Sequence, residues 1–397
     1  MRVVIFVILI YIVNHRINYA QSFNSIDSTI ITLPFTSDDK PALNLYLKGD
    51  TFCLLNIYGN EFYLLDRHGE VHKKLMLSKL LNPKLPFYPV TFTASSNYYI
   101  FWDGRRILML DKFLKFYGFY SLRDTIQPHY INTNLFSLFF SESNNRFYYS
   151  SVTGFRDSTK IQSLTSEYYS EKFLTSFYIP RDKKKDSSTL HRLYTCNYYI
   201  SRPSIFGTSR GYLPHLDFRD LFFDENNKEI IISEAADSLI YGYDLNGNKL
   251  YTFGRKGRLI QGKDSIRFIT TFDQYKYNYI RGAFSCFLDS IKYQSAQYLY
   301  IKSNSDLQLV AREYVVPDTV NIVAGAKINY HSFEIERESL IKRSYYIQIY
   351  DHHNLVKEIK VPQDWQLVGF ENTKLVFYKL FRDEKDATYK LLIYYIS

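Results

Sequence analysis

Short runs of apolar and aromatic residues, closed by Gly, Asn, Asp or Pro, make up almost the whole chain after residue 21. Many of these runs alternate apolar and polar positions, which is the period of two expected for a half-buried β-strand. No stretch of twelve or more residues carries the i, i+3, i+4, i+7 stripe of an amphipathic helix, and 71–81 comes nearest to it. The pattern therefore predicts an all-β protein.

The clearest single element is a β-hairpin in 239–257, LIYGYDLNGNKLYTFGRKG. Its two apolar runs flank Leu-Asn-Gly-Asn, and Asn-Gly tolerates the positive φ angles of tight hairpin turns. Weaker copies recur along the chain, and each ends its first run on an aspartate whose carboxylate can cap the turn. These aspartates, to which we assign a structural role, are Asp66, Asp111, Asp244 and Asp351. The residues three positions further on, three of which suit a left-handed conformation, are Gly69, Leu114, Gly247 and Asn354.

Further strands precede these hairpins, so the repeating unit holds three or four antiparallel strands. Such a repeated unit is typical of the blades of a β-propeller. Linked β-sandwiches would also give many short strands, but no Pro/Gly/Ser-rich linker divides the chain. We expect six four-stranded blades, with seven as the alternative if an insertion at 158–176 or 304–343 hides one. The expected blades are 42–77, 90–120, 135–200, 218–254, 283–361 and 366–397.

Two blades need special features. In the fifth, we expect an inner strand at 297–302 and then a long elaborated loop up to residue 343. In the last, the strand at 389–396 has no partner after it. The segment STIITLP at 28–34 would supply the missing outer strand, which closes the ring and removes a free sheet edge.

The N-terminus has the pattern of a secretory signal peptide. Arg2 precedes eleven apolar residues at 3–13, and a polar stretch leads to a cleavage point between Ala20 and Gln21. Eleven apolar residues are too few to span a bilayer, although a retained anchor is the alternative. Since the first cysteine is Cys53, we expect no lipoprotein. The expected organisation is a signal peptide at 1–20 and a single propeller at 21–397, exported to the periplasm or the cell exterior.

Composition narrows the choice of partners. The net charge is +9, but basic residues are scattered, and the densest run, at 181–186, is interrupted by acids. We therefore expect no nucleic-acid partner. We also expect no transmembrane span after signal cleavage, and a monomer. The three cysteines (Cys53, Cys196 and Cys286) lie in apolar runs without metal-ligand spacing, which predicts buried thiols.

Two segments carry a resemblance to a known group. The segment 211–257, which includes FFDENNKEIIISEAADSLIYGYDLNGNKL, and YYIQIYDHHNLVKEIKVPQDWQLVGF at 345–370 resemble the six-bladed, TolB-like or NHL-like propellers exported by Bacteroidota. The Ala-Gln cleavage site resembles that group as well. That group includes a family of unknown function. The resemblance implies the fold and export. It transfers no catalytic residue, because the group has no agreed catalytic motif.

Short motifs that could carry chemistry lack the context that the chemistry needs. Gly207-Thr-Ser-Arg-Gly211 matches GxSxG, but the following Tyr-Leu-Pro-His does not open the helix of a nucleophile elbow. His68 and His72 are separated by a turn glycine, and His352-His353 is itself a turn pair, so we expect no metal. No Walker A loop, calcium loop or GxGxxG is present, so we expect no cofactor.

Propeller topology points to one face of the molecule. The loops between blades and those between second and third strands share this face, opposite the aspartate hairpins. We expect eight side chains from these loops to face a central funnel and bind a ligand, the alternative being that they only solvate or pin the loops. The eight residues are Asp103, Arg105, His129, Arg210, His215, Asp237, Arg281 and Trp365.

The sequence favours an exported, non-enzymatic module that binds a glycan, peptide or protein. No residue is nominated as catalytic. The alternative is a hydrolase or lyase with its site in the funnel, in which His129 or His215 would do acid/base work and Arg281 would hold an anionic substrate.

Overall fold

The structure of the protein is a computed structural model. It describes residues 26–35, 40–103, 106–123, 135–151, 172–179, 190–201, 219–224, 226–234, 238–255, 257, 297–304, 308–320, 341–385 and 388–397. These residues form strands β1 to β24 and one short 3-10 helix, η1 (Leu77–Leu80). They include no helix that is long and apolar enough to span a membrane.

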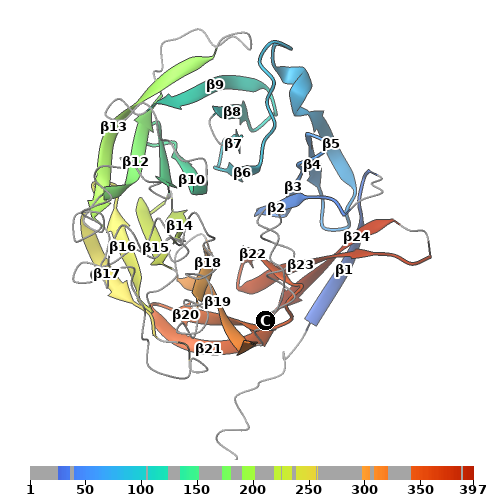
Figure 1. Cartoon of the computed structure of the whole chain (residues 1–397), viewed down its shortest axis with the longest axis vertical. Helices are drawn as coiled ribbons and strands as arrows, with labels where there is room; N and C mark the ends of the chain where they lie inside the picture. Colours follow the sequence, from blue (N-terminus) through green and yellow to red (C-terminus); the bar gives the residue numbers. More distant parts are fainter. Residues whose placement is uncertain are drawn as a thin grey trace, which may run out of the picture.

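The strands form six blades arranged around a common axis (Figure 1). Blade 1 contains β2 (Leu43–Lys48), β3 (Thr51–Asn56), β4 (Glu61–Leu65) and β5 (Val71–Met76). Blade 2 contains β6 (Thr91–Ala94), β7 (Tyr98–Trp102), β8 (Arg106–Asp111) and β9 (Phe116–Arg123). Blade 3 contains β10 (Leu135–Ser141), β11 (Arg146–Ser151), β12 (Lys172–Tyr178) and β13 (His191–Ser201).

Blade 4 contains β14 (Arg219–Asp224), β15 (Glu229–Glu234), β16 (Ile240–Asp244) and β17 (Lys249–Phe253). Blade 5 contains β18 (Gln297–Ser303), β19 (Leu309–Val320), β20 (Ile341–Asp351) and β21 (Asn354–Val361). Blade 6 contains β22 (Gln366–Glu371), β23 (Lys374–Arg382), β24 (Tyr389–Ile396) and β1 (Ile26–Thr32).

Each blade is an antiparallel sheet, with the first strand nearest the axis and the last at the periphery (Figure 1). The predicted six-bladed propeller is therefore confirmed. The expected boundaries of blades 1 to 4 and 6 agree closely with the strands, the largest difference being the end of blade 2 at residue 123 instead of 120.

The predicted closure of the ring is confirmed as well. β1 pairs antiparallel with β24 along its whole length, from Ile26 opposite Ile396 to Thr32 opposite Lys390. The N-terminal strand is thus the outermost strand of blade 6, and both ends of the described chain lie in one blade.

One prediction for blade 5 was wrong. The inner strand at 297–302 is confirmed, but 309–320 is the second strand, β19, rather than part of a long loop. Pro317 disfavours a strand at this position because proline cannot donate a ladder hydrogen bond. The register of β19 against β20 shifts between Pro317 and Thr319, and this bulge accommodates the proline. Residues 321–340 and 283–296 lie outside the described residues. In blade 3, similarly, the end of the expected insertion at 158–176 belongs to β12.

The aspartate hairpins join third and fourth strands, as predicted. Asp66, Asp111 and Asp244 each accept two backbone N–H bonds through Oδ1, from the second and fourth residues after the aspartate, at 2.8–2.9 Å. Their structural role is confirmed. In the fourth hairpin, Asp351 instead contacts the His352 ring Nδ1 at 2.6 Å.

The expected left-handed positions are only partly correct. Gly69 and Gly247 have positive φ, and so does Leu114, at 63°, although leucine was not expected there. In the fourth hairpin, the positive φ angles fall on His352 (45°) and His353 (66°) rather than on Asn354. That turn is two residues long, because Asp351 pairs directly with Asn354.

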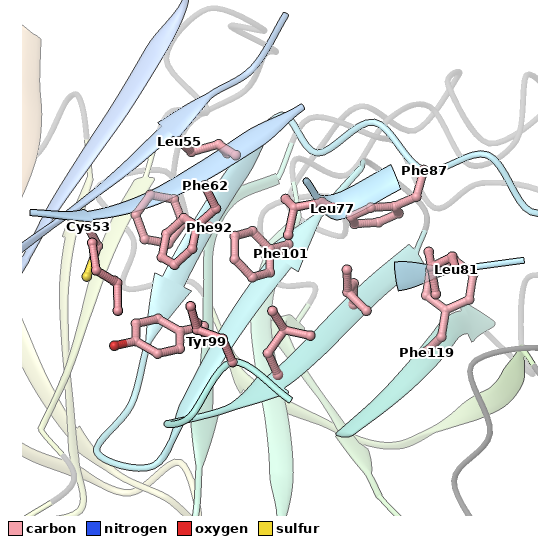
Figure 2. Packing of buried hydrophobic residues seen from close by; sticks show 14 residues of the cluster. Cys53, Leu55, Phe62, Leu77, Leu81, Phe87, Phe92, Tyr99, Phe101 and Phe119 are labelled. Carbon is pink, nitrogen blue, oxygen red and sulfur yellow. The ribbon is translucent and has the colours of Figure 1, made fainter. Parts of the chain in front are cut away.

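The second and third strands of blades 1 and 2 are buried on both faces, which explains their continuous apolar runs. In β3, Phe52 and Leu54 pack toward blade 6, whereas Cys53 and Leu55 pack toward blade 2. Six hydrophobic clusters fill the six junctions between neighbouring blades. Figure 2 shows the junction of blades 1 and 2, where the Phe62 ring lies 4.9 Å from that of Phe101 in an edge-on contact.

Cys53 is fully buried in this cluster, which confirms the predicted buried thiol for that cysteine. Burial raises the pKa of the thiol to about 12, although Lys48 and Tyr99 act in the opposite direction. The Cys196 side chain and Cys286 lie outside what the structure describes.

Two features of the ring have no counterpart in the sequence pattern. The outer strands of blades 2 and 3 pair in parallel, from Tyr120 opposite His191 to Arg123 opposite Tyr194, which joins the two blades into one eight-stranded sheet. Between blades 4 and 5, the guanidinium of the fully buried Arg312 donates to the carbonyls of Ser238 and Arg255 at 2.9 and 3.0 Å. Both contacts fix the position of one blade against the next.

Candidate functional site

The antiparallel order of the strands divides the loops between two faces. Turns between first and second strands, and between third and fourth strands, lie on one face, which we call the hairpin face. Turns between second and third strands, and the links from one blade to the next, lie on the other, the connection face. The eight predicted site residues all belong to connection-face loops. Six of them lie outside the described residues, so their positions remain predictions: Arg105, His129, Arg210, His215, Asp237 and Arg281.

Asp103 lies in the turn between β7 and β8 and is engaged by a neighbour. One carboxylate oxygen accepts from the backbone N–H of Arg106 at 2.6 Å, and the other accepts from the guanidinium of Arg106 at 2.6 and 2.7 Å. The Asp103 side chain is only 6% exposed. The guanidinium carbon of Arg106 lies 5.6 Å from the centroid of the Phe119 ring. This arrangement fixes the turn and neutralises the carboxylate.

Trp365 lies on the link between blades 5 and 6. Its ring stacks on Tyr394 at 3.8 Å and 18°, and its centroid lies 5.7 Å from that of Phe377. Tyr394 belongs to β24, the third strand from the axis, so the indole covers the outer part of blade 6. Next to it, Asp364 pairs with Lys379 at 2.6 Å. Partial burial raises the pKa of Tyr394, an effect that nearby Lys379 opposes and nearby Asp364 supports.

A surface that carries none of the eight predicted side chains lies on the connection face of blade 1. Tyr58, in the turn between β3 and β4, is 79% exposed, and Tyr88 and Val90, on the link to blade 2, are 67% and 51% exposed. Lys79 and Lys84 on the same link are also exposed. We call these residues the tyrosine platform: Tyr58, Lys79, Lys84, Tyr88 and Val90.

Hydrogen bonds fix the backbone of this platform. Asn60, which has a positive φ of 53° and is 6% exposed, donates through Nδ2 to the carbonyl of Phe87 at 2.9 Å. The carbonyl of Asn60 accepts from the N–H of Leu77 at 3.0 Å. The N–H of Val90 donates to the carbonyl of Trp102 in blade 2 at 2.7 Å. The two segments that carry the tyrosines are therefore joined directly to each other and to the neighbouring blade.

Apolar side chains anchor the platform from below. Leu77, Leu81 and Phe87 are 0%, 6% and 1% exposed and belong to the cluster between blades 1 and 2. The Phe87 ring packs edge-on against Phe119 at 5.5 Å, at one end of the cluster in Figure 2. Because alternate positions of the link are buried, Tyr88 and Val90 are held facing outward.

The segment that carries most of the platform is rich in lysine and lacks acidic residues. Residues 71–102 contain Lys73, Lys74, Lys79 and Lys84 and no aspartate or glutamate. The nearest acid in sequence to the β3–β4 turn, Glu61, is occupied: its oxygens lie 2.7 Å from the Lys74 ammonium and 2.6 Å from the Tyr63 hydroxyl. Partial burial acts to raise the pKa of Glu61, but the bonds from Lys74 and Tyr63 outweigh it and hold that pKa below its usual value.

The sequence did contain a signal for this surface. The link between blades 1 and 2, NPKLPFYPV, is rich in proline, and a tyrosine stands between two prolines. What the sequence could not show is that the side chain of Asn60 bonds to the Phe87 carbonyl and so joins the Tyr58 turn to the link that carries Tyr88. Among the described residues, no group of three or more His, Cys, Asp or Glu side chains is placed to hold a metal ion.

No protein-family model matches the chain, and no curated protein matches it. Among solved structures, it is similar to a member of the DUF4221 family from Bacteroides vulgatus, with a TM-score of 0.60, 11% identity, and 95% of this chain and 99% of that one covered. It is also similar to a Bacteroides fragilis protein whose name presents it as exported, with a TM-score of 0.52, 12% identity, and 96% and 98% covered. A streptogramin B lyase gives a TM-score of 0.43 at 10% identity, with 94% of this chain and 99% of that one covered. This similarity is too weak to support any statement about activity. The first two similarities establish the same six-bladed fold as that expected from the resemblance in sequence.

Proposed function

We propose that this protein is an exported, monomeric, non-enzymatic binding module that holds a glycan, peptide or protein ligand on the connection face of a rigid propeller. The observation that carries the proposal is the exposure of Tyr58 and Tyr88, at 79% and 67%, on a backbone fixed by hydrogen bonds. Exposed aromatic rings on a fixed backbone supply contact area at little cost in conformational entropy. Grouped on one face, they mark a binding surface.

Export rests on the apolar run at 3–13 and the Ala20-Gln21 step, which lie outside the described residues. The name of the similar Bacteroides fragilis protein supports it. When the chain is expressed in a secreting bacterial host, the secreted protein should have the mass of a chain that begins at Gln21. Recovery of the uncleaved chain in the membrane fraction would instead support an anchor.

The eight residues predicted from the loops remain part of the proposal as a second set of contacts. Asp103 and Trp365 already have partners in the fold, so their substitution tests stability together with binding. Among the remaining six, Arg210→Gln and Arg281→Gln remove charge with little change in size. A loss of ligand binding without a loss of thermal stability would place them in the site.

The decisive experiment is a screen of the mature chain against glycan and peptide arrays and against chromogenic esters. We expect saturable binding without turnover. Turnover that disappears in His129→Ala or His215→Ala would overturn the proposal in favour of the hydrolase or lyase. Phe113→Ala, at a 60% exposed ring in a turn of the hairpin face, is the matched control and should change neither property.

A further inference from the structure

We propose that the tyrosine platform of blade 1 binds an acidic polysaccharide, with Tyr58 and Tyr88 stacking on sugar rings and Lys79 and Lys84 pairing with their carboxylates. The proposal rests on the proposed function, since it names the ligand class of that binding module.

The stacking part follows from the exposure of the two rings. A tyrosine ring has a negative face that attracts the partly positive C–H edges of a sugar ring, and its hydroxyl remains available to water or to a sugar hydroxyl. Tyr58 and Tyr88 are 79% and 67% exposed, and they lie on two segments joined by the bond from Asn60 to the Phe87 carbonyl. Because the backbone that carries both rings is fixed, only the two side chains have to be ordered when a sugar chain binds.

The charge part follows from the composition of residues 71–102. This segment has four lysines and no acidic residue, and neither Lys79 nor Lys84 is paired with a carboxylate of the described residues. Lys74, by contrast, is committed to Glu61. Two exposed ammonium groups on the segment that also carries Tyr88 suit a ligand whose sugar rings each carry a single negative charge.

Other ligands fit this surface less well. Single-stranded nucleic acid also stacks on aromatic rings, but it is held by a groove of basic residues along its backbone. The two exposed lysines of the platform are too few for such a groove. Lysine is depleted in protein–protein interfaces, which disfavours a folded protein partner.

The test uses the full mature chain and affinity electrophoresis in gels that contain polygalacturonate. The matched ligand is the same polymer with its carboxylates methyl-esterified, which keeps the sugar rings and removes the charges. We expect retardation by the acidic form, weaker retardation by the ester, and a loss of the difference in about 1 M NaCl, where the screening length falls to about 3 Å.

Variants separate the two contributions. Tyr58→Ala and Tyr88→Ala should each weaken binding of both polymers about tenfold, the scale expected from losing one aromatic stack. Lys79→Gln combined with Lys84→Gln should abolish the preference for the acidic polymer and leave binding of the ester unchanged. Phe113→Ala and Lys112→Gln, at exposed positions of the hairpin face, are the controls and should behave as the wild type. Thermal melts confirm that each variant is folded.

The outcomes distinguish this inference from the proposed function. Platform variants that bind polygalacturonate like the wild type would overturn the inference, and so would tighter binding of oligo(dT) or of anionic lipid vesicles at the same residues. A wild-type chain that binds other members of the glycan or peptide arrays, but not polygalacturonate, would overturn the inference and leave the binding module standing. A chain that binds nothing in any assay would overturn both.

Discussion

At the scale of single residues, the hairpin turns show how burial can outweigh backbone strain. Leu114 takes the left-handed conformation that costs an ordinary residue roughly 1–2 kcal/mol. Its side chain is only 8% exposed, in the cluster between blades 1 and 2, and burying a leucine contributes about 1.5–3 kcal/mol. The strained turn is therefore kept because the side chain packs. Turn preferences read from the sequence omit this compensation, so Leu114 was the one misjudged position among the first three hairpins.

The capping aspartates predict a pH dependence of stability. Partial burial acts to raise the pKa of Asp244, but bonds from Asn248 and Asn246 outweigh it, so the native pKa lies below its ordinary value. The unfolded chain therefore binds the proton more tightly. The cap's contribution is complete above the unfolded value of about 3.9 and is lost as the pH falls below it.

We expect Asp244→Asn, which keeps an acceptor oxygen but does not titrate, to show a shallower fall in melting temperature than the wild type between about pH 5 and pH 3. Asp244→Ala should lower the free energy of unfolding at neutral pH by about 1 kcal/mol, the net value of a hydrogen bond or two. Parallel pH profiles for wild type and Asp244→Asn would show that the turn does not carry this linkage.

At the scale of elements, strands were predictable wherever their hydrophobic pattern was local. The inner and middle strands read as apolar runs because both of their faces are buried, and their limits could be placed to within a few residues. β19 was missed because Pro317 is a strand breaker by itself, and only its pairing with β20 shows that a bulge absorbs it. The platform was missed for a related reason: Asn60 connects two segments whose relation no periodicity encodes.

The strand β1 offers a matched pair of neighbouring isoleucines. Ile31 is fully buried between blade 6 and blade 1, whereas Ile30 on the opposite face of the same strand is 57% exposed. We expect Ile31→Ala to lower the free energy of unfolding by about 2–5 kcal/mol and Ile30→Ala to change it by no more than about 0.5 kcal/mol. Chemical denaturation of the two variants measures both values. Equal effects would mean that β1 does not close the ring in solution.

At the scale of the whole molecule, the number of blades and the closure followed from counting repeats and from the unpaired last strand. The parallel pairing of β9 with β13 could not be predicted in this way. These two peripheral strands belong to different blades, so no repeat within one blade indicates that they pair. The candidate site shows the same division. Topology identified the connection face, but the side chains that the fold leaves exposed there, Tyr58 and Tyr88, are defined by burial that only packing decides.

Closure of a ring by a strand from the other end of the chain predicts complementation in trans. Without residues 21–35, β24 becomes an exposed edge strand and blade 1 loses the contact of Ile31, so we expect the truncated chain to melt at a lower temperature and to aggregate. A synthetic peptide of residues 26–35 should restore the melting temperature in a concentration-dependent way, because it binds only the folded state.

The same peptide carrying Ile31→Asp is the control and should fail, since it would bury a charge in the junction of blades 6 and 1. The Ile30→Asp peptide should still work, because that side chain faces solvent. A truncated chain that melts like the wild type, or rescue by both aspartate peptides, would show that the ring does not depend on this strand.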